Sequence, residues 1–260
     1  MQTQRALPPK PTSEGYRLEL TRLPRLTIWR RSFRRVIGWI LRLFVRICTR
    51  CTISGMETMP RYGAAIVVFN HLGDADPLIG TTILQRQMEF FAKAELYNYP
   101  ILGKLMDAYG VIWVHRGMPD RRALRAALDA LSDGRLVAIA PEGRESLTGA
   151  LEEGTGGAAF LAHKSGLPVL PVTYTGTENA RVYHNLRHFK RTRVSLTVGK
   201  PFKLEPGGDR QKAIQKGTQQ IMQALADLLP AEYRGVYQSP DLQPISVYEA
   251  PEVGGQNGSG

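Results

Sequence analysis

Between residues 55 and 230 the sequence alternates short apolar runs with segments of helical periodicity, and this alternation restricts the fold more than any other feature. The apolar runs, which predict strands, are 64–69, 88–92, 111–114, 136–140, 169–174 and 194–198. The segments with helical spacing are 78–86, 99–108, 120–131, 157–164 and 210–229. Strands that alternate with helices predict an α/β fold with a largely parallel central sheet flanked by helices. In such a sheet, ligands bind in the crevice beyond the carboxyl ends of the strands.

A strongly basic segment precedes this alternation. Residues 26–50 contain seven arginines and no acidic residue. At 100° per residue, one arc of a helix collects the apolar side chains Trp29, Phe33, Val36, Ile37, Ile40, Leu43, Phe44 and Ile47. The opposite side carries Arg31, Arg35, Arg42 and Arg46. This pattern predicts an amphipathic helix over 25–50 that lies in a membrane interface, with its guanidinium groups at lipid phosphates. The alternative is a core helix with a charged outer face.

The charge balance points to an anionic partner. Lysine and arginine outnumber aspartate and glutamate by 34 to 23, for a formal net charge of +11. We expect an anionic membrane surface, bound through residues 25–50, and no nucleic acid, because the basic helix has a continuous apolar face and no aromatic stacking platform stands out. No uncharged apolar stretch approaches the roughly 20 residues that span a bilayer. The expected location is therefore the cytoplasmic face of a membrane, as a peripheral or monotopic protein.

The two ends and the cysteines complete the predicted organisation. We expect a flexible segment over 1–24, the interfacial helix over 25–50, one α/β domain over 51–235 and a disordered tail rich in proline and glycine over 236–260. The only cysteines are Cys48 and Cys51, which excludes a disulfide scaffold and favours a reducing compartment. A single C-x-x-C pair also lacks the second ligand pair of a zinc site.

The first polar cluster follows a strand in the stretch VVFNHLGDADPL, residues 67–78. A histidine here can act as a general base near neutral pH, and it works better when a carboxylate accepts a hydrogen bond from Nδ1. In a turn that leads into a helix, a separation of five residues can bring Asp76 beside His71, and Asp74 is the rival partner. Asp76 can instead be a helix cap, and His71 can be purely structural.

The second cluster, APEGRES at 140–146, follows the strand predicted at 136–140. The order of Asn70-His71, Asp76 and then Pro141-Glu142-Gly143 with an arginine resembles the glycerolipid acyltransferase family, in particular its lysophosphatidic acid acyltransferase group. The resemblance extends to the lead-in at 53–60 and to the blocks at 92–117 and 166–176. It covers roughly residues 53–200.

This resemblance implies transfer of a fatty acyl group from acyl-CoA or acyl carrier protein to the hydroxyl of a lysolipid, without a metal or redox cofactor. The acceptor expected first is 1-acyl-glycerol-3-phosphate, which yields phosphatidic acid. His71 would remove the hydroxyl proton, Asp76 would orient His71, and Glu142 with Gly143 would hold the glycerol portion of the acceptor. Another lysophospholipid, an amino- or glycolipid acceptor, and a catalytically silent membrane-binding relative remain alternatives.

Phosphate recognition requires fixed cations, preferably arginine. Arg116 and Lys93 match an arginine and a lysine of the family's second block, although either can be an ordinary charged end of a strand. The third motif departs from the family's common P-E-G-T-R-S, because Arg144 stands one place early and Glu145 fills the usual position of the arginine. Arg144 can still reach a phosphate, whereas Glu145 would repel one in the same pocket.

Overall fold

The computed structural model describes residues 8–13, 17, 19–84, 86–117, 120–205 and 209–238 and is built around a seven-stranded sheet in the order β1-β7-β6-β2-β5-β3-β4. The strands are β1 (Thr49–Ser54), β2 (Ala65–Phe69), β3 (Met88–Lys93), β4 (Ile112–Val114), β5 (Leu136–Ile139), β6 (Val169–Thr175) and β7 (Thr192–Val198). The helices are α1 (Ile28–Cys48), α2 (Ala75–Ile83), α3 (Leu102–Tyr109), α4 (Arg121–Ser132), α5 (Gly157–Ser165), α6 (Asn179–Arg187) and α7 (Arg210–Leu228). Four short 3₁₀ helices complete the described elements: η1 (Met56–Thr58), η2 (Ala94–Asn98), η3 (Ala231–Tyr233) and η4 (Gly235–Tyr237).

Only the β6–β7 pair of this sheet is antiparallel, so the predicted α/β class with a largely parallel sheet is confirmed. Two elements were not predicted, β1 and α6. β1 is a mostly exposed edge strand of sequence TRCTIS, so it has no apolar run to reveal it. α6 buries none of its residues and therefore lacks the apolar stripe by which helices are found in sequence.

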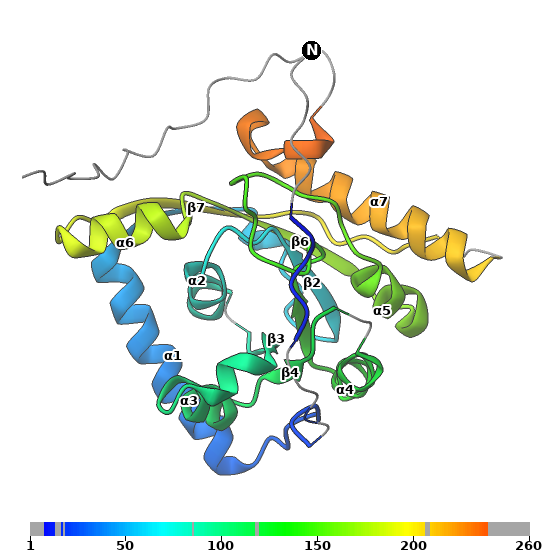
Figure 1. Cartoon of the computed structure of the whole chain (residues 1–260), viewed down its shortest axis with the longest axis horizontal. Coiled ribbons are helices and arrows are strands. Elements are labelled where there is room, and N and C mark those ends of the chain that lie inside the picture. The colour runs from blue at the N-terminus through cyan, green and yellow to red at the C-terminus, as the bar shows by residue number, and fades with distance from the viewer. Residues whose placement is uncertain are drawn as a thin grey trace, which may run out of the picture.

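The strand β2 separates two layers of core. Its five residues are all buried, and successive side chains of a strand point to opposite faces of the sheet. Ile66 and Val68 pack in the cluster that includes α4, α5 and α7, whereas Val67 and Phe69 pack in the cluster of α1 and α2. Figure 1 shows these two groups of helices on either side of the sheet. Burial on both faces explains why β2 reads as a continuous apolar run in the sequence.

The inner side of α1 is fastened to the sheet by a buried ion pair. Arg34 Nη1 and Nη2 donate to the two carboxylate oxygens of Glu89 in β3 at 2.9 and 2.7 Å, and the side chains are only 1% and 2% exposed. The remaining guanidinium donors reach the carbonyls of Tyr109 and Gly110. Because each of the three guanidinium nitrogens donates to an acceptor, the buried charge is compensated.

The apolar arc of α1 faces away from the sheet. Its exposed large side chains are Ile28, Trp29, Val36, Trp39, Ile40, Leu43, Phe44 and Ile47, and α3 with its preceding turn adds Tyr99, Ile101, Leu102 and Leu105. A core helix with a charged outer face would bury these apolar side chains. Among the described residues, no helix is both long and apolar enough to cross a bilayer. Contact of this apolar face with a membrane stays a prediction.

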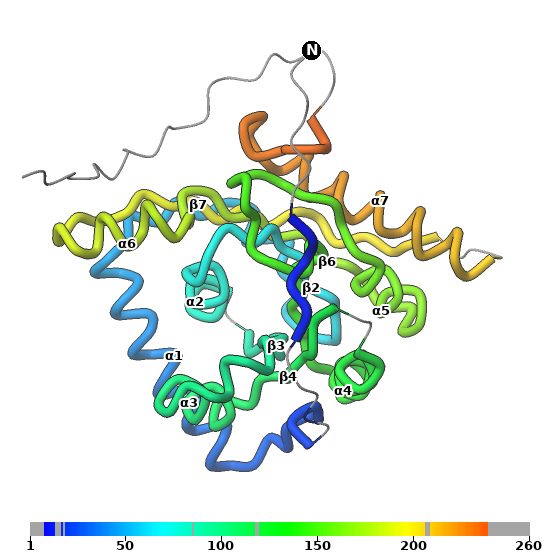
Figure 2. Tube along the Cα trace, in the orientation of Figure 1, coloured from blue at the N-terminus to red at the C-terminus, as the bar shows by residue number. Residues whose placement is uncertain are grey.

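The N-terminal segment departs from the expected flexible stretch over 1–24 wherever it is described. Lys10 Nζ donates to the carbonyl of Glu142 at 2.6 Å, and Ser13 and Arg116 exchange hydrogen bonds. Leu20 is buried beside β3 and β4. These contacts hold residues 8–13 across the carboxyl edge of the sheet, along the path traced in Figure 2. We call residues 8–13 the N-terminal strap. Residues 1–7 and most of the predicted tail, 239–260, lie outside the described residues.

Candidate active site

The residues selected from the sequence meet along one edge of the sheet. His71 follows β2, Lys93 ends β3, Arg116 follows β4, and Glu142 follows β5. These four strands are consecutive neighbours in the order β2-β5-β3-β4 and run parallel, so their carboxyl ends share one side. The sheet therefore presents a histidine at one end of this edge and two cations towards the other end.

His71 and Asp76 form the predicted pair. Nδ1 of His71 lies 2.9 Å from Asp76 Oδ2, and the same oxygen accepts the N–H groups of Leu72 and Gly73. The rival carboxylate, Asp74, instead accepts the hydroxyl hydrogen of Tyr183 at 2.6 Å. Because a carboxylate only accepts, Nδ1 carries the proton and Nε2 is left with a lone pair. Nε2 makes no hydrogen bond within the part of the chain that the structure describes, and the side chain is 22% exposed.

The electrostatics of this pair keep the imidazole basic. Burial alone lowers the pKa of His71, but the hydrogen bond and charge of Asp76, with smaller contributions from Glu145 and Glu142, raise it above its ordinary value of 6.5. Asp76 is completely buried, at 0% exposure, in the first turn of α2, where the helix dipole favours a carboxylate. The arrangement gives a ring whose orientation and tautomer are fixed and whose free nitrogen can accept a proton.

The loop after β5 holds the backbone of His71 on both sides. Glu142 Oε1 accepts the N–H of His71 at 3.1 Å, and the N–H of Ser146 donates to the carbonyl of His71 at 2.7 Å. Glu142 Oε2 accepts from the N–H of Glu152, and the carboxyl group is fully buried. Burial raises the pKa of Glu142 to about 7, although both N–H groups favour the ionised form. In this arrangement Glu142 supports His71 from behind.

Gly143 makes the turn that allows this clamp. Its φ of 74° lies in the left-handed region, and its N–H donates to the carbonyl of Ala140. Gly143 is exposed at the site. The predicted contacts of Glu142 and Gly143 with the glycerol portion of an acceptor stay predictions.

Arg116 and Lys93 form a cationic region around Glu95. Nε of Arg116 is buried and has no hydrogen-bond partner among the described residues. Burial acts to raise the pKa of Glu95, but hydrogen bonds from Ser13 and from the backbone, together with the charges of Arg116 and Lys93, lower it below its ordinary value. A buried guanidinium nitrogen without an acceptor is a position where a bound anion would gain a charge-assisted hydrogen bond.

Arg144 is directed away from this region. Its Nε and Nη2 donate to Glu152 Oε2 at 2.8 and 2.7 Å, and Nη1 donates to the carbonyl of Pro8 in the N-terminal strap. Glu145 accepts from the side chain of Asn179, whose Oδ1 in turn accepts the N–H of Asp74. The structure thus places a neutralised arginine and a charged glutamate near His71. Binding of an acceptor by Arg144 stays a prediction.

Two arrangements at this edge of the sheet were not found from the sequence. Asn70 bridges β2 and β6, because its side chain donates to the carbonyl of Tyr174 and accepts that residue's N–H. It fixes the point where His71 leaves the sheet, but a lone asparagine after a strand gives no signal of this role. His115 and Asp120 repeat the spacing of His71 and Asp76, with Nδ1 3.2 Å from Asp120 Oδ2.

The second pair differs from the first in access and in its free nitrogen. His115 is 4% exposed, and its Nε2 already accepts the N–H of Arg17 at 3.0 Å. Asp120 also caps α4 by accepting the N–H groups of the first turn. This pair therefore joins the N-terminal segment to the sheet and has no ring nitrogen available to a substrate.

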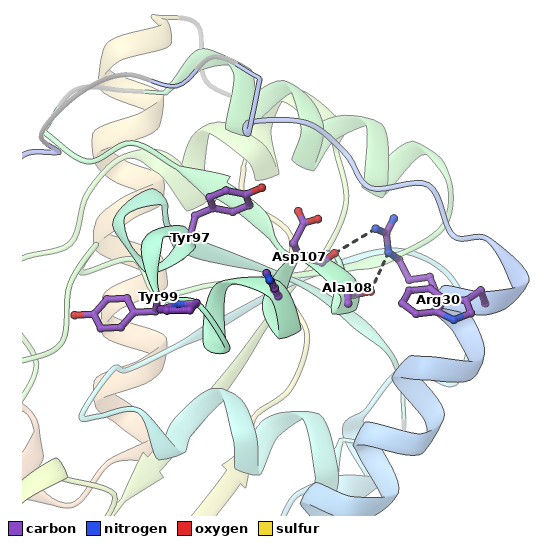
Figure 3. Close-up of a pocket in the computed structure, with 8 residues that line it drawn as sticks. Arg30, Tyr97, Tyr99, Asp107 and Ala108 are labelled. Atoms are coloured by element: carbon purple, nitrogen blue, oxygen red, sulfur yellow. Dashed lines mark hydrogen bonds between the residues drawn. The ribbon is translucent and has the colours of Figure 1, made fainter.

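A surface pocket of about 370 Å³ lies apart from this edge, between α1 and α3 (Figure 3). It is lined by Trp29, Arg30, Tyr97, Tyr99, Pro100, Lys104, Asp107 and Ala108. Arg30 closes one side by donating to the carbonyls of Ala108 and Asp107 at 3.1 and 3.2 Å. None of these lining residues is a site residue selected from the sequence, so we place the chemistry at His71.

Known proteins resemble the chain over the segment that carries these residues. The profile of the family described as Acyltransferase matches residues 50–175. The chain is 30% identical over 134 residues to a 1-acyl-sn-glycerol-3-phosphate acyltransferase of Borreliella burgdorferi, covering 49% of this chain and 52% of that protein. It is 29% identical over 201 residues to one of Chlamydomonas reinhardtii, covering 75% and 58%. The chain thus spans little more than half the length of these relatives.

A shorter relative and a solved structure extend the likeness. The chain is 25% identical over 184 residues to the 1-acyl-sn-glycerol-3-phosphate acyltransferase of Bacillus subtilis, covering 68% of this chain and 88% of that protein. The crystal structure of the 1-acyl-sn-glycerophosphate acyltransferase PlsC from Thermotoga maritima shares the fold, with a TM-score of 0.56, 23% identity and coverage of 78% and 84%. With the motifs found in the family's order along one sheet edge, these matches support a glycerolipid acyltransferase family for the chain.

Proposed function

We propose that the protein transfers a fatty acyl group from a thioester, acyl-CoA or acyl carrier protein, to the hydroxyl of a lysolipid, with 1-acyl-glycerol-3-phosphate as the leading acceptor and phosphatidic acid as the product. The observation that carries this proposal is the His71–Asp76 pair, with Nδ1 held at 2.9 Å and Nε2 without a partner in the described chain. Names of the relatives support the choice of acceptor.

The reaction follows from the free nitrogen. Nε2 of His71 takes the hydroxyl proton while the acceptor oxygen attacks the thioester carbonyl carbon, and Asp76 stabilises the imidazolium that forms. The tetrahedral intermediate then collapses with cleavage of the C–S bond, and the imidazolium returns the proton to the leaving thiolate. An ester and a free thiol result. Because a thioester is already activated, the proposed reaction requires no metal or redox cofactor and no enzyme nucleophile.

The direct test is product analysis. Purified protein is incubated with acyl-CoA or acyl carrier protein thioester and a panel of lysolipids, and the products are identified by mass spectrometry. The proposal expects diacyl product and free thiol in equal amounts, with the largest yield from 1-acyl-glycerol-3-phosphate. If neither donor transfers an acyl group to any acceptor of the panel, the alternative of a catalytically silent membrane-binding relative is favoured.

A different acceptor is the second candidate, and one observation favours it. Glu145 stands where the family usually has an arginine, and its charge contributes to the raised pKa of His71. A carboxylate close to the base favours an acceptor whose head group is neutral or carries an amine over one with a bare phosphate. The lysolipid panel therefore includes lysophosphatidylethanolamine and a glycolipid. A higher rate with either would replace lysophosphatidic acid as the assigned acceptor.

We expect Arg116→Gln to weaken binding of a phosphate-bearing acceptor. The buried guanidinium nitrogen would lose its charge-assisted hydrogen bond, so KM for 1-acyl-glycerol-3-phosphate should rise about tenfold while KM for the thioester donor stays unchanged. Steady-state kinetics with each substrate varied in turn measures the two constants. Arg121→Gln, which removes an exposed arginine at the start of α4, is the matched control. Equal KM values in the two variants would contradict this role of Arg116.

We also propose that α1 attaches the protein to anionic membranes at the cytoplasmic face. Arg31, Arg35 and Arg46 are exposed and make no hydrogen bond or ion pair with other described side chains, whereas Arg42 donates to the carbonyl of Thr82. Each cation near an anionic surface contributes about 1 kcal/mol. An interfacial anchor would keep the site beside an acceptor that stays in the bilayer, which avoids extracting its acyl chain.

Replacing Arg31, Arg35 and Arg46 together by glutamine should weaken binding to anionic vesicles by at least about tenfold. Activity on vesicle-borne acceptor should fall in parallel, whereas activity on detergent-dispersed acceptor should be retained. Sedimentation with vesicles measures the binding. The control replaces Arg121, Arg125 and Lys164, which lie on the helices of the other face of the sheet, and removes the same charge. Equal loss in both triple variants would show a general charge effect and contradict attachment through α1.

A further inference from the structure

The turn after α6 presents a phenyl ring that packs against nothing in the chain. Phe189 is 100% exposed. Its φ of 53° is also the only positive value at a non-glycine position in the described residues. A left-handed conformation at a large side chain is strained. Exposure and strain together make Phe189 an unusual residue for the fold alone.

The end of α6 imposes this conformation. The N–H of Phe189 donates to the carbonyl of Leu186 at 3.2 Å, and the N–H of Lys190 donates to the carbonyl of Asn185 at 2.8 Å. These two bonds form a Schellman motif, in which the left-handed residue is most often glycine. Neither the local backbone nor packing within the chain therefore favours phenylalanine at this position.

The surroundings of the ring are strongly basic. Residues 179–203 contain seven lysines and arginines and no acidic residue. Arg187, Lys190 and Arg191 lie within two residues of the ring. An exposed aromatic ring among cations matches the chemistry of a membrane interface, where the ring enters the acyl boundary and the cations meet lipid phosphates.

This basic turn is fastened to the end of α1. Arg191 Nη2 donates to the carbonyl of Arg46 at 2.9 Å, and its Nε donates to the carbonyl of Thr49 at 3.0 Å. The neighbouring side chains of α1, Phe44 and Ile47, are exposed. Two segments without acidic residues, far apart in sequence, therefore meet in space, and Figure 1 shows α6 beside the upper end of α1.

We infer that Phe189 and its basic neighbours form a second membrane contact that inserts into an anionic bilayer beside α1. The inference rests on the membrane attachment proposed above. The helix α6, which precedes Phe189, reaches the site at its other end. There Asn179 accepts the N–H of Asp74, and Tyr183 donates to the Asp74 carboxylate. A second contact beside one end of α1 restricts rotation of the protein about that helix, so α6 sets the orientation of the His71 crevice against the lipid surface.

The test compares wild type with Phe189→Gly and Phe189→Leu on vesicles of phosphatidylglycerol and phosphatidylcholine at constant salt. Glycine adopts the left-handed conformation without strain, so Tm should stay equal or rise. Vesicle affinity should nevertheless fall about tenfold, because the variant lacks the ring that inserts into the bilayer. Leucine should retain most of the affinity. Val236→Ser is the matched control, because Val236 is an exposed apolar residue on η4, which packs with α7 on the other face of the sheet.

Three results would overturn the inference. Phe189→Gly binds vesicles as wild type does, Val236→Ser loses as much affinity as Phe189→Gly, or the glycine variant loses affinity for a labelled DNA duplex and not for vesicles. A different pattern identifies failure of the underlying proposal. If wild type itself does not bind vesicles but still acylates a detergent-dispersed acceptor, membrane attachment and the second contact are both wrong, and the acyl transfer assigned to His71 stands.

Discussion

Replacing His71 by alanine is expected to lower kcat/KM for acyl transfer about a thousandfold without unfolding the protein. Loss of a positioned general base typically costs a factor of this size. The bonds of Glu142 and Ser146 go to the backbone of residue 71, so the change leaves this clamp in place. Initial rates with saturating thioester, together with circular dichroism of the variant, measure the two effects separately.

Asp76→Asn tests the charge of the orienting group. The amide oxygen can still accept the N–H groups of Leu72 and Gly73, so the turn is preserved, but the imidazolium loses its counter-ion. We expect kcat to fall about a hundredfold. Because asparagine keeps the backbone bonds of a capping residue, a fall in kcat in this variant reports the charge of Asp76 and its hydrogen bond to His71.

The pH dependence supplies an independent readout. His71 acts as a base only when neutral, and its pKa is raised above 6.5, so the rate should rise with pH through a midpoint above that value. In Asp76→Asn the hydrogen bond to a carboxylate and its charge are gone. Because both raise the pKa, the midpoint should move to lower pH. A midpoint that stays the same in the variant would show that His71 and Asp76 are not coupled during the reaction.

His115 provides the matched control, because His115 and Asp120 have the same spacing in sequence as the proposed pair. Its Nε2 accepts a backbone N–H and the ring is buried, so His115→Gln should lower Tm and leave the pH midpoint unchanged. Activity is compared at a temperature where both variants are folded. A shift of the midpoint in His115→Gln as large as that in Asp76→Asn would remove the basis for choosing His71 as the base.

The pairs His71–Asp76 and His115–Asp120 also show what the sequence can and cannot predict. Both have histidine and aspartate five residues apart, and spacing does not tell them apart. What separates them is a contact from Arg17, nearly a hundred residues away in the chain. Strands such as β2 were predictable because a strand that is buried on both faces has a continuous apolar run in its sequence. The relative positions of Lys93, Arg116 and Glu142 followed from the rule that parallel strands end on one side.

The features that escaped prediction depend on long-range contacts between polar groups. The carboxylate of Glu142 accepts the N–H groups of His71 and Glu152, and these two bonds were not predicted. The N-terminal strap lacks periodicity, and long-range hydrogen bonds to Arg116, to Arg144 and to the carbonyl of Glu142 hold it in place. Neither set of bonds follows from residue type or local spacing.

The buried ion pair of Arg34 and Glu89 is another long-range polar contact that could not be predicted from the sequence. Breaking it should have a large effect on stability. In the sequence Arg34 is one of several arginines in a basic helix, and the sheet turns it inward. We expect Glu89→Gln to lower the free energy of unfolding by about 3–5 kcal/mol, because it leaves the guanidinium buried without a counter-ion. Urea unfolding monitored by fluorescence measures the change.

The double variant Arg34→Met, Glu89→Met separates the cost of an unpaired charge from the value of the pair. Burying two charges requires their desolvation, and a well-packed apolar pair is often as stable. We therefore expect the double variant to be more stable than Glu89→Gln by at least about 2 kcal/mol. A double variant as unstable as the single one would mean that the bonds of Arg34 to the carbonyls of Tyr109 and Gly110, at the end of α3, hold α1 in place. In that case α1 would depend on the guanidinium itself, and the ion pair would be secondary to the geometry of its donors.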